Sequence, residues 1–194
     1  MCASAIGYYG NRGNNELSEK DDKGSDFISM VCDEWEKSAQ IALKNDIRTV
    51  LLRIGIVLSP MGGALKRLLF PFNFRFGTKI GSGSQYMSWV TIDDVLGAIN
   101  HILHNESLKG AVNIVSPYPV TNAKFVKILA GILEHNIIFT IPEALINLVF
   151  KDMGREVLLS STRAMPEKLI NSGYRFRYSE LEHALKHLLG RKSV

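Results

Sequence analysis

The sequence predicts an α/β fold built on a parallel sheet, followed by a small, mainly helical part. The first observation is the order of patterns at the start of the chain, where residues 2–6, 26–46 and 47–58 resemble a strand, a helix and a strand. This order is typical of parallel strands joined by a crossover helix. The second observation is a change to short helical stretches in the last quarter of the chain. We therefore expect a sheet domain over residues 1–140 and a small helical domain over residues 141–194.

The first predicted helix follows a polar loop. The glycine, asparagine and charged residues of positions 11–25 argue against regular core structure there. Ser25 or Asp26 can cap the helix that follows. Asn45 and Asp46 end it. Its apolar residues recur at helical spacing, so we expect one buried stripe. The stripe comprises Ile28, Val31, Trp35, Ala39 and Ala42.

The remaining elements follow in order. Residues 47–58 are apolar on both alternations, as in a strand covered on both faces. The segment 71–84 resembles a loop, and strands are expected at 85–90 and 110–116, with a short extended piece at 137–142. Helices are expected where apolar residues recur at helical spacing behind a turn or a capping side chain. They lie at 64–70, after Thr91 or Asp93, and after Thr121 or Asn122.

Composition and charge limit the classes of function. The chain is 46% hydrophobic and 22% charged, and no apolar run reaches the roughly 20 residues needed to cross a membrane. The net charge is +4, but lysine and arginine are scattered among carboxylates, which disfavours a nucleic-acid binder. The two cysteines suggest neither a disulfide framework nor a metal site, and His183 and His187 fit a solvated helix face. We expect a soluble, cytoplasmic protein without a metal, membrane or nucleic-acid partner.

The glycine-rich stretch at residues 81–84 has two interpretations. A dinucleotide-binding loop follows a strand and opens a helix, whereas a predicted strand follows this stretch. Glycine also lets the backbone approach a ligand closely. We therefore expect a turn that approaches a substrate rather than a phosphate loop.

Five stretches occur in an order that resembles a known family. They are "SAIGYYG", "VCDEWE", "LLRIGIVLSPMGGAL", "IGSGSQYMSWVTIDDV" and "NIVSPYPVTNAKF". Over essentially its whole length the chain resembles an epimerase-like branch of the atypical extended short-chain dehydrogenases/reductases, labelled sugar-nucleotide epimerase or cell-division-inhibitor-like. The resemblance covers only the C-terminal part of such a protein and implies that its dinucleotide fingerprint would precede Met1. The implied fold is a truncated Rossmann-like α/β sheet with a small, mainly helical C-terminal domain.

The resemblance also implies a nicotinamide cofactor, NADP or NAD, and a set of catalytic side chains. In the family a tyrosine acts as acid and base, a lysine four residues later lowers its pKa, and a serine or threonine orients the substrate oxygen. Ser4 matches the serine, but Cys32 and Glu36 stand where the tyrosine and lysine are expected. An anionic Glu36 raises the pKa of a nearby acid rather than lowering it. Tyr8 and Tyr9 remain as candidate acids, and we take Ser4 and Tyr8 as the candidate catalytic residues.

The segment from Arg53 to Val57 resembles the strand end that meets the nicotinamide ring in the family. The resemblance implies that backbone groups of this segment face the ring. The candidate cofactor-binding residues are therefore Arg53, Gly55, Ile56 and Val57. The alternative is a buried core strand in which Arg53 forms a structural ion pair.

The substrate side is predicted from the strand at 85–90. Gln85, Met87 and Trp89 alternate along it and so share one face. Gln85 can bind a polar group and Trp89 can offer a stacking wall, which makes them the candidate substrate residues. The alternative is a strand that only covers the core.

Three functions are compatible with these residues. The first is an NAD(P)-dependent, epimerase-like oxidoreductase acting on a small molecule of sugar-nucleotide type. The second is a non-catalytic binding or regulatory module of the same fold, because the usual tyrosine and lysine are replaced. The third is an incomplete product of a longer gene. The residues predict no oligomeric state.

Overall fold

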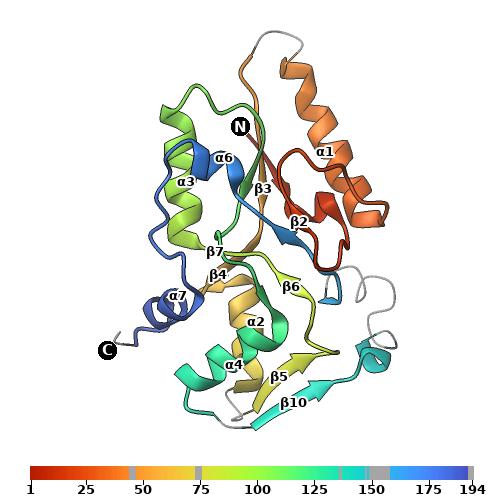
Figure 1. The fold of residues 1–194 in the computed structure, drawn as a ribbon, viewed down its shortest axis with the longest axis vertical. Coiled ribbons are helices and arrows are strands. Elements are labelled where there is room, and N and C mark those ends of the chain that lie inside the picture. The colour runs from red at the N-terminus through yellow and green to blue at the C-terminus, as the bar shows by residue number, and fades with distance from the viewer. Residues whose placement is uncertain (44–46, 73–75, 136, 147, 149–157, 192–194) are drawn as a thin grey trace.

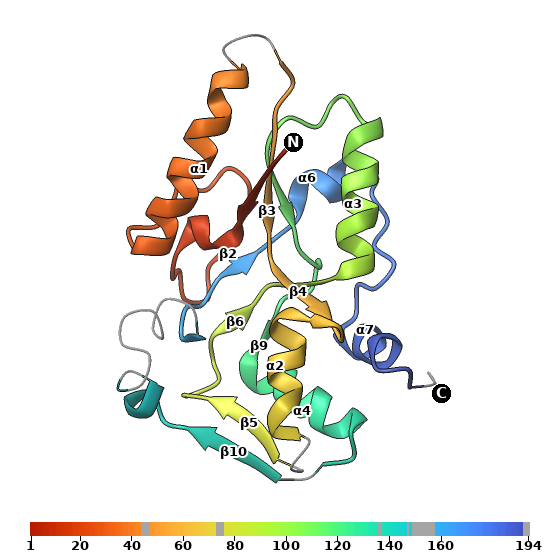
Figure 2. The same ribbon diagram turned by 180° about the vertical axis from the view of Figure 1, so that it is seen from behind.

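A parallel sheet of three strands lies at the centre of the upper part of the molecule (Figure 1). The computed structural model describes residues 1–43, 47–72, 76–135, 137–146, 148 and 158–191. The strand order is β1-β3-β8, with β1 at Cys2–Ala5, β3 at Val50–Ile54 and β8 at Gly110–Ile114. Both views place helix α1 on one side of β3 and helix α3 on the other (Figures 1 and 2). The α/β class and the parallel sheet that the sequence predicts are confirmed.

The two faces of this sheet differ in polarity. Successive side chains of a strand point to opposite faces, and Val50 and Leu52 of β3 join an apolar cluster with Ile102 of α3. α3 spans Ile92–His104, and Thr91 caps it by accepting a hydrogen bond from the backbone N–H of Asp94 at 3.1 Å. The face toward α1 instead carries polar side chains. The candidate site lies on that second face.

Helix α1 spans Phe27–Leu43, and Asp26 caps it through a 2.8 Å bond from the backbone N–H of Ser29. The predicted apolar stripe is wrong, because Trp35 is 57% exposed. The buried face instead carries Ser29, Cys32 and Glu36. A carboxylate can lie on a buried helix face only when a charged or hydrogen-bonding partner meets it. Sequence periodicity cannot identify that partner, because it lies on β3.

The predicted strand at 47–58 is two strands that separate at Gly55. β3 pairs with β1 and β8, whereas β4, at Ile56–Ser59, pairs with β7, at Trp89–Thr91. At the break, the backbone N–H of Gly55 donates to the Ile114 carbonyl at 3.0 Å and that of Ile56 to the Ser88 carbonyl at 2.8 Å. A Cβ atom on Gly55 would lie 2.4 Å from the Ser88 carbonyl oxygen, so only glycine fits this crossing.

The predicted strand at 85–90 is also divided, at Ser88. β6, at Tyr86–Met87, pairs antiparallel with β9, at Val120–Thr121, whereas β7 pairs with β4. The Ser88 hydroxyl donates to the Thr162 carbonyl at 2.8 Å and accepts from the Ala164 N–H at 2.9 Å. These contacts replace strand pairing at this position, and they come from a distant part of the chain.

Two segments predicted as loops contain short strands. β5, at Phe76–Ile80, pairs in parallel with β10, at Ile137–Ile141, at the bottom of Figure 1. β2, at Glu16–Leu17, pairs with β11, at Arg163–Ala164. Each pairing joins residues far apart in the sequence. Helices α2, at Gly63–Phe72, and α4, at Asn122–Ile132, pack beside β5, and Thr121 caps α4.

The described part of the C-terminal segment packs into the cores of the preceding elements. α6, at Glu167–Asn171, places Leu169 in the apolar cluster of β3 and α3, and α7, at Leu181–Leu188, places Leu185 in that of α4. Asp94 also bonds to this segment, accepting from the backbone N–H groups of Arg177 at 2.7 Å and Tyr178 at 3.0 Å. In the part of the chain that the structure describes, no helix is long and apolar enough to cross a membrane.

Candidate functional site

A row of three polar side chains crosses the sheet close to the carboxyl ends of its strands. Ser4 of β1 is in register with Arg53 of β3, which is in register with Asn113 of β8. The exposed fractions are 6% for Ser4, 4% for Arg53 and 0% for Asn113. Ligands of open α/β sheets bind beyond these strand ends. The row therefore lies where a site is expected, although its members are buried.

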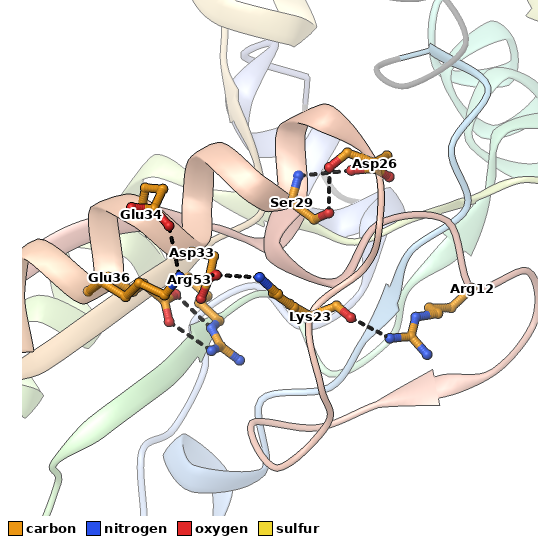
Figure 3. Close-up of polar contacts among 9 residues, drawn as sticks. Arg12, Lys23, Asp26, Ser29, Asp33, Glu34, Glu36 and Arg53 are labelled. Atoms are coloured by element: carbon orange, nitrogen blue, oxygen red, sulfur yellow. Dashed lines mark hydrogen bonds and ion pairs between the residues drawn. The ribbon is translucent and has the colours of Figure 1, made fainter.

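Glu36 balances the charge of this row. Arg53 donates from Nε to Oε1 and from Nη2 to Oε2 of Glu36, both at 2.8 Å (Figure 3). The Ser4 hydroxyl donates to Oε1 of the same carboxylate at 2.7 Å. Burial lowers the pKa of Arg53, but hydrogen bonds and charge attraction from Glu36 and Tyr9 raise it overall, so the guanidinium stays charged. The structural ion pair, which the sequence left as the alternative role of Arg53, is therefore present.

Two tyrosines from the 3-10 helix at Ile6–Tyr9 enclose the guanidinium. Its Cζ lies 3.4 Å from the centre of the Tyr8 ring, a cation–π contact. The Tyr9 hydroxyl accepts from Arg53 Nη1 at 3.0 Å and donates to Asn113 Oδ1 at 2.7 Å. Burial raises the pKa of Tyr9 to about 12, partly offset by Arg53. Tyr9 is therefore a neutral donor inside the network, and the half-buried Tyr8 lies at its edge.

The network continues toward the C-terminal segment through Asn113. Its side-chain Nδ2 donates to the Met165 carbonyl at 2.9 Å, and its backbone N–H donates to Glu19 Oε1 at 3.0 Å. Burial raises the pKa of Glu19, against the lowering effect of backbone N–H groups. The network therefore ties the end of the central sheet to residues from both ends of the chain.

The spacing of Cys32 and Glu36 on α1 brings only Glu36 into the network. Burial raises the pKa of the Cys32 thiol, and the negative charge of Glu36 adds to this rise. A thiol with a raised pKa is a weak nucleophile and a poor general acid at neutral pH. The geometry therefore offers no acid/base pair at these two helix positions.

The candidate cofactor segment runs from this network to the edge of a cavity. The N–H groups of Gly55 and Ile56 bond to the protein backbone. Val57 packs against the apolar cluster of β3 and α3, whereas Ile56 lines the cavity. Of the predicted cofactor residues, Ile56 is thus the one that the structure places at a cavity wall.

That cavity, of about 480 Å³, lies between α2, β5 and β6. Gln85 lines it, and its Nε2 donates to the carbonyls of Ile80 at 3.1 Å and Leu158 at 3.3 Å. No described residue donates to its amide oxygen Oε1, which can therefore accept from a ligand. The described lining residues also include Ala64, Arg67, Leu68, Tyr86, Met87 and Asn122.

Gln85 also lines a neighbouring cavity of about 350 Å³ on the glycine-rich turn. Its described lining is polar, and Glu143 is the charged residue among it. Gly81 and Gly83 of the turn have φ angles of +56° and +74°, which favour glycine. The turn therefore forms a cavity wall, as the sequence suggested for a turn near a substrate, and its role in binding stays a prediction.

Trp89 does not reach either cavity. It is fully buried in the core between β4, α2 and α4, and its Nε1 donates to the Tyr118 carbonyl at 3.1 Å. The break at Ser88 turns Trp89 away from the face of Gln85. A stacking wall for a substrate is therefore not accessible at Trp89 in this structure.

Gly7, Gly10 and Gly13 have the spacing of the glycines in a dinucleotide-binding loop. Like such a loop, they follow a strand, β1. In the structure this segment leads to β2 and not to a helix N-terminus, which a phosphate loop requires. A Cβ atom on Gly7 would lie 2.6 Å from Ile28 of α1, so this glycine allows close packing. The geometry does not form a phosphate cradle.

The chain is similar in sequence to curated proteins over almost its whole length. An epimerase family protein of Mycobacterium bovis is 36% identical over 183 residues, covering 94% of this chain and 61% of the relative. The human epimerase family protein SDR39U1 is 32% identical, covering 97% of this chain and 64% of the relative. Over these residues the chain is similar to proteins named as epimerase family proteins. It spans about three fifths of the length of these curated relatives.

Solved structures agree with this family. The crystal structure of the human epimerase family protein SDR39U1 with NADPH superposes on this chain with a TM-score of 0.90 at 30% identity, covering 97% of this chain and 64% of that one. A nucleoside-diphosphate sugar epimerase of Corynebacterium glutamicum gives a TM-score of 0.80 at 32% identity, covering 97% of this chain and 36% of that one. Residues 141–188 match a family model described as a domain of unknown function, DUF1731.

Sequence reasoning missed several members of the buried network. Asn113, Glu19 and the role of Glu36 as partner of Arg53 were not predicted. A signal for two of them exists, because Arg53 and Asn113 are the polar residues inside the apolar strands "VLLRI" and "GAVNI". Polar side chains in buried strands need partners, and in a parallel sheet such positions can meet.

Proposed function

We propose that the chain supplies the substrate side and the nicotinamide-facing segment of an epimerase-like, NAD(P)-dependent oxidoreductase. The observation that carries the proposal is the row of Ser4, Arg53 and Asn113 near the carboxyl ends of parallel strands. The segment that follows Arg53 leads from this row to Ile56, which lines the cavity together with Gln85. The NADPH-bound human relative supports a nicotinamide cofactor.

The chemistry proposed for this site differs from the usual tyrosine and lysine mechanism of the family. Ser4 is held by Glu36, and Tyr8 is the remaining candidate acid at the edge of the network. A substrate oxygen near Ser4 would compete with Glu36 for the hydroxyl proton. The proposed roles are therefore orientation of the substrate by Ser4 and proton donation by Tyr8.

The experiment that tests the cofactor part is a titration of the chain with NADPH, followed by nicotinamide fluorescence. We expect saturable binding with a Kd below about 1 mM, equivalent to about 4 kcal/mol. Reduced nicotinamide mononucleotide should compete, whereas 2′,5′-ADP should not, because the proposal assigns only the nicotinamide half of the cofactor to this chain. An absence of saturation by both nicotinamide compounds at millimolar concentration would reject the proposal.

The second candidate is a non-catalytic binding module of the same fold. The buried, charge-paired Glu36 and the protonated Cys32 favour it, because they remove the usual acid/base pair. The two functions are distinguished by whether the protein turns over a substrate or only binds it. Substrate-dependent oxidation of NADPH that falls in the Ser4→Ala and Tyr8→Phe variants would support the enzyme, and binding without turnover would support the module.

A further inference from the structure

The cavity between α2, β5 and β6 has two kinds of wall. Its apolar wall includes Ile56 of β4, Leu68 of α2 and Met87 of β6. Its volume of about 480 Å³ falls in the range of small-molecule sites, roughly 300 to 1,000 Å³. The apolar wall fits an apolar or aromatic ligand body, and the polar groups of the cavity then decide what else the ligand carries.

Arg67 of α2 is the cation of this wall. Among the described lining residues there is no aspartate or glutamate, and the structure records no ion pair for Arg67 with any described residue. Arg53, in contrast, is fully engaged by Glu36. A guanidinium at the rim of an apolar cavity, with no carboxylate among the described residues to neutralise it, attracts an anionic group.

The amides of the cavity add polar selectivity. Gln85 uses its N–H groups on Ile80 and Leu158, so its oxygen can accept from a ligand. Asn122 is 2% exposed, and its oxygen is occupied by the backbone N–H of Ile80 at 2.9 Å. Its Nδ2 donates to Met87 Sδ at 3.5 Å, so Gln85 is the amide with an oxygen that can orient a ligand, and it adds no charge.

The neighbouring cavity on the glycine-rich turn does not extend the positive charge. Its described lining contains Glu143 and neutral side chains such as Ser82, Ser84 and Asn11. A ligand with two or more negative charges would therefore meet one cation in the first cavity and one carboxylate in the next. The charge pattern favours a ligand with a single anionic group.

We propose that the cavity binds a small organic monoanion, an apolar or aromatic body with one carboxylate, sulfonate or phosphate diester, held by Arg67. This inference rests on the proposed function, since it names the substrate class of the same site. It predicts that a nucleoside diphosphate sugar is the poorer ligand, because its diphosphate brings more charge than Arg67 can neutralise.

The test uses two fluorescent probes that share their rings and differ in charge. 8-Anilinonaphthalene-1-sulfonate carries one sulfonate, and N-phenyl-1-naphthylamine is neutral. Arg67 is exposed, so Arg67→Gln should fold, and we expect it to weaken the sulfonate probe by about tenfold or more. The neutral probe should change by less than about twofold. Lys127→Gln on α4, which lines a different groove, removes the same charge and should alter neither probe.

A second variant locates the probe. Ala64 lines the cavity, and Ala64→Phe should fill it and weaken both probes. Unchanged affinity of the sulfonate probe in Arg67→Gln, or of both probes in Ala64→Phe, would overturn the proposal. Displacement of the probe by UDP-glucose at lower concentration than by 4-phenylbutyrate would overturn the monoanion class. The NADPH titration is independent of these outcomes, so the proposed function and the substrate class can fail separately.

Discussion

Glu36 of α1 and Arg53 of β3 form an ion pair with two hydrogen bonds in the protein interior, both side chains being 5% exposed. The Glu36→Gln variant leaves the guanidinium buried without its counter-charge. We expect the free energy of unfolding to fall by about 3–5 kcal/mol in urea denaturation.

Two variants control this prediction. Lys37→Gln removes surface ion pairs with Asp33 and Glu34 and should cost far less stability than Glu36→Gln, because solvent screens exposed pairs. If Glu36→Gln does not fold, the double variant Glu36→Leu with Arg53→Met removes both charges and should recover much of the loss. Equal stability of Glu36→Gln and Lys37→Gln would contradict the role assigned to the pair.

We expect the buried Tyr9 to make the folded protein less stable at alkaline pH. Burial raises its pKa from 10.0 to about 12, so the folded protein keeps a proton that the unfolded chain loses above pH 10. Stability therefore falls as pH rises through this range. Between pH 10 and 11 we expect Tyr9 to contribute about 1 kcal/mol of this loss.

The measurement compares urea midpoints of the wild type and Tyr9→Phe across this range. Tyr9→Phe also loses hydrogen bonds to Arg53 and Asn113, which lowers stability at every pH. The decisive quantity is the slope with pH, which should be shallower in the variant. Some slope should remain, because burial also raises the pKa of Tyr174. Parallel slopes would show that Tyr9 does not titrate as stated.

The sequence predicts the parts of the fold that depend on local pattern. The parallel strands and the caps at Thr91 and Thr121 follow from alternation, helical periodicity and capping side chains. The strand breaks at Gly55 and Ser88 do not, because they depend on partners elsewhere in the chain. Ser88, for example, is held by Thr162 and Ala164.

The residues of the candidate site also fall into those that the sequence indicates and those that depend on long-range contacts. The resemblance to a family brings attention to Ser4 and Arg53, but it cannot predict that Glu36 bonds to both. Sequence alternation also places Gln85 and Trp89 on one face, whereas the break at Ser88 sends Trp89 into the core. Long-range partners decide these positions, and a single sequence does not reveal them.

We expect Asp94 to stabilise the junction of α3 with the C-terminal segment. Its carboxylate is 1% exposed and accepts from the N–H groups of Arg177 and Tyr178 and from the Tyr174 hydroxyl. Asp94→Ala leaves the two N–H groups without an acceptor, whereas the Tyr174 hydroxyl keeps its bond to the backbone carbonyl of residue 94 at 3.1 Å. We expect a loss of about 3 kcal/mol or more in urea denaturation. Asp93→Ala, on the same helical turn, removes a carboxylate that pairs with His187 at 3.4 Å and with no other described residue, and it should cost less than about 1 kcal/mol. Similar losses of stability in both variants would contradict the stabilising role of Asp94 at this junction.

Gly55 tests the crossing between the two sheets. In Gly55→Ala the new Cβ meets the Ser88 carbonyl at 2.4 Å and Val115 at 2.6 Å, and neither the backbone nor the buried Val115 can move away easily. We expect a loss of about 2 kcal/mol or more, since overpacking in a core typically costs 1–3 kcal/mol. Gly62→Ala is the matched control, because its Cβ would meet nothing within 4 Å. Its stability should equal that of the wild type or slightly exceed it.

Because Ile56 lines the cavity directly after Gly55, Gly55→Ala should also weaken binding of the neutral naphthylamine probe, which Gly62→Ala should leave unchanged. A Gly55→Ala protein with wild-type stability would show that the crossing does not require glycine.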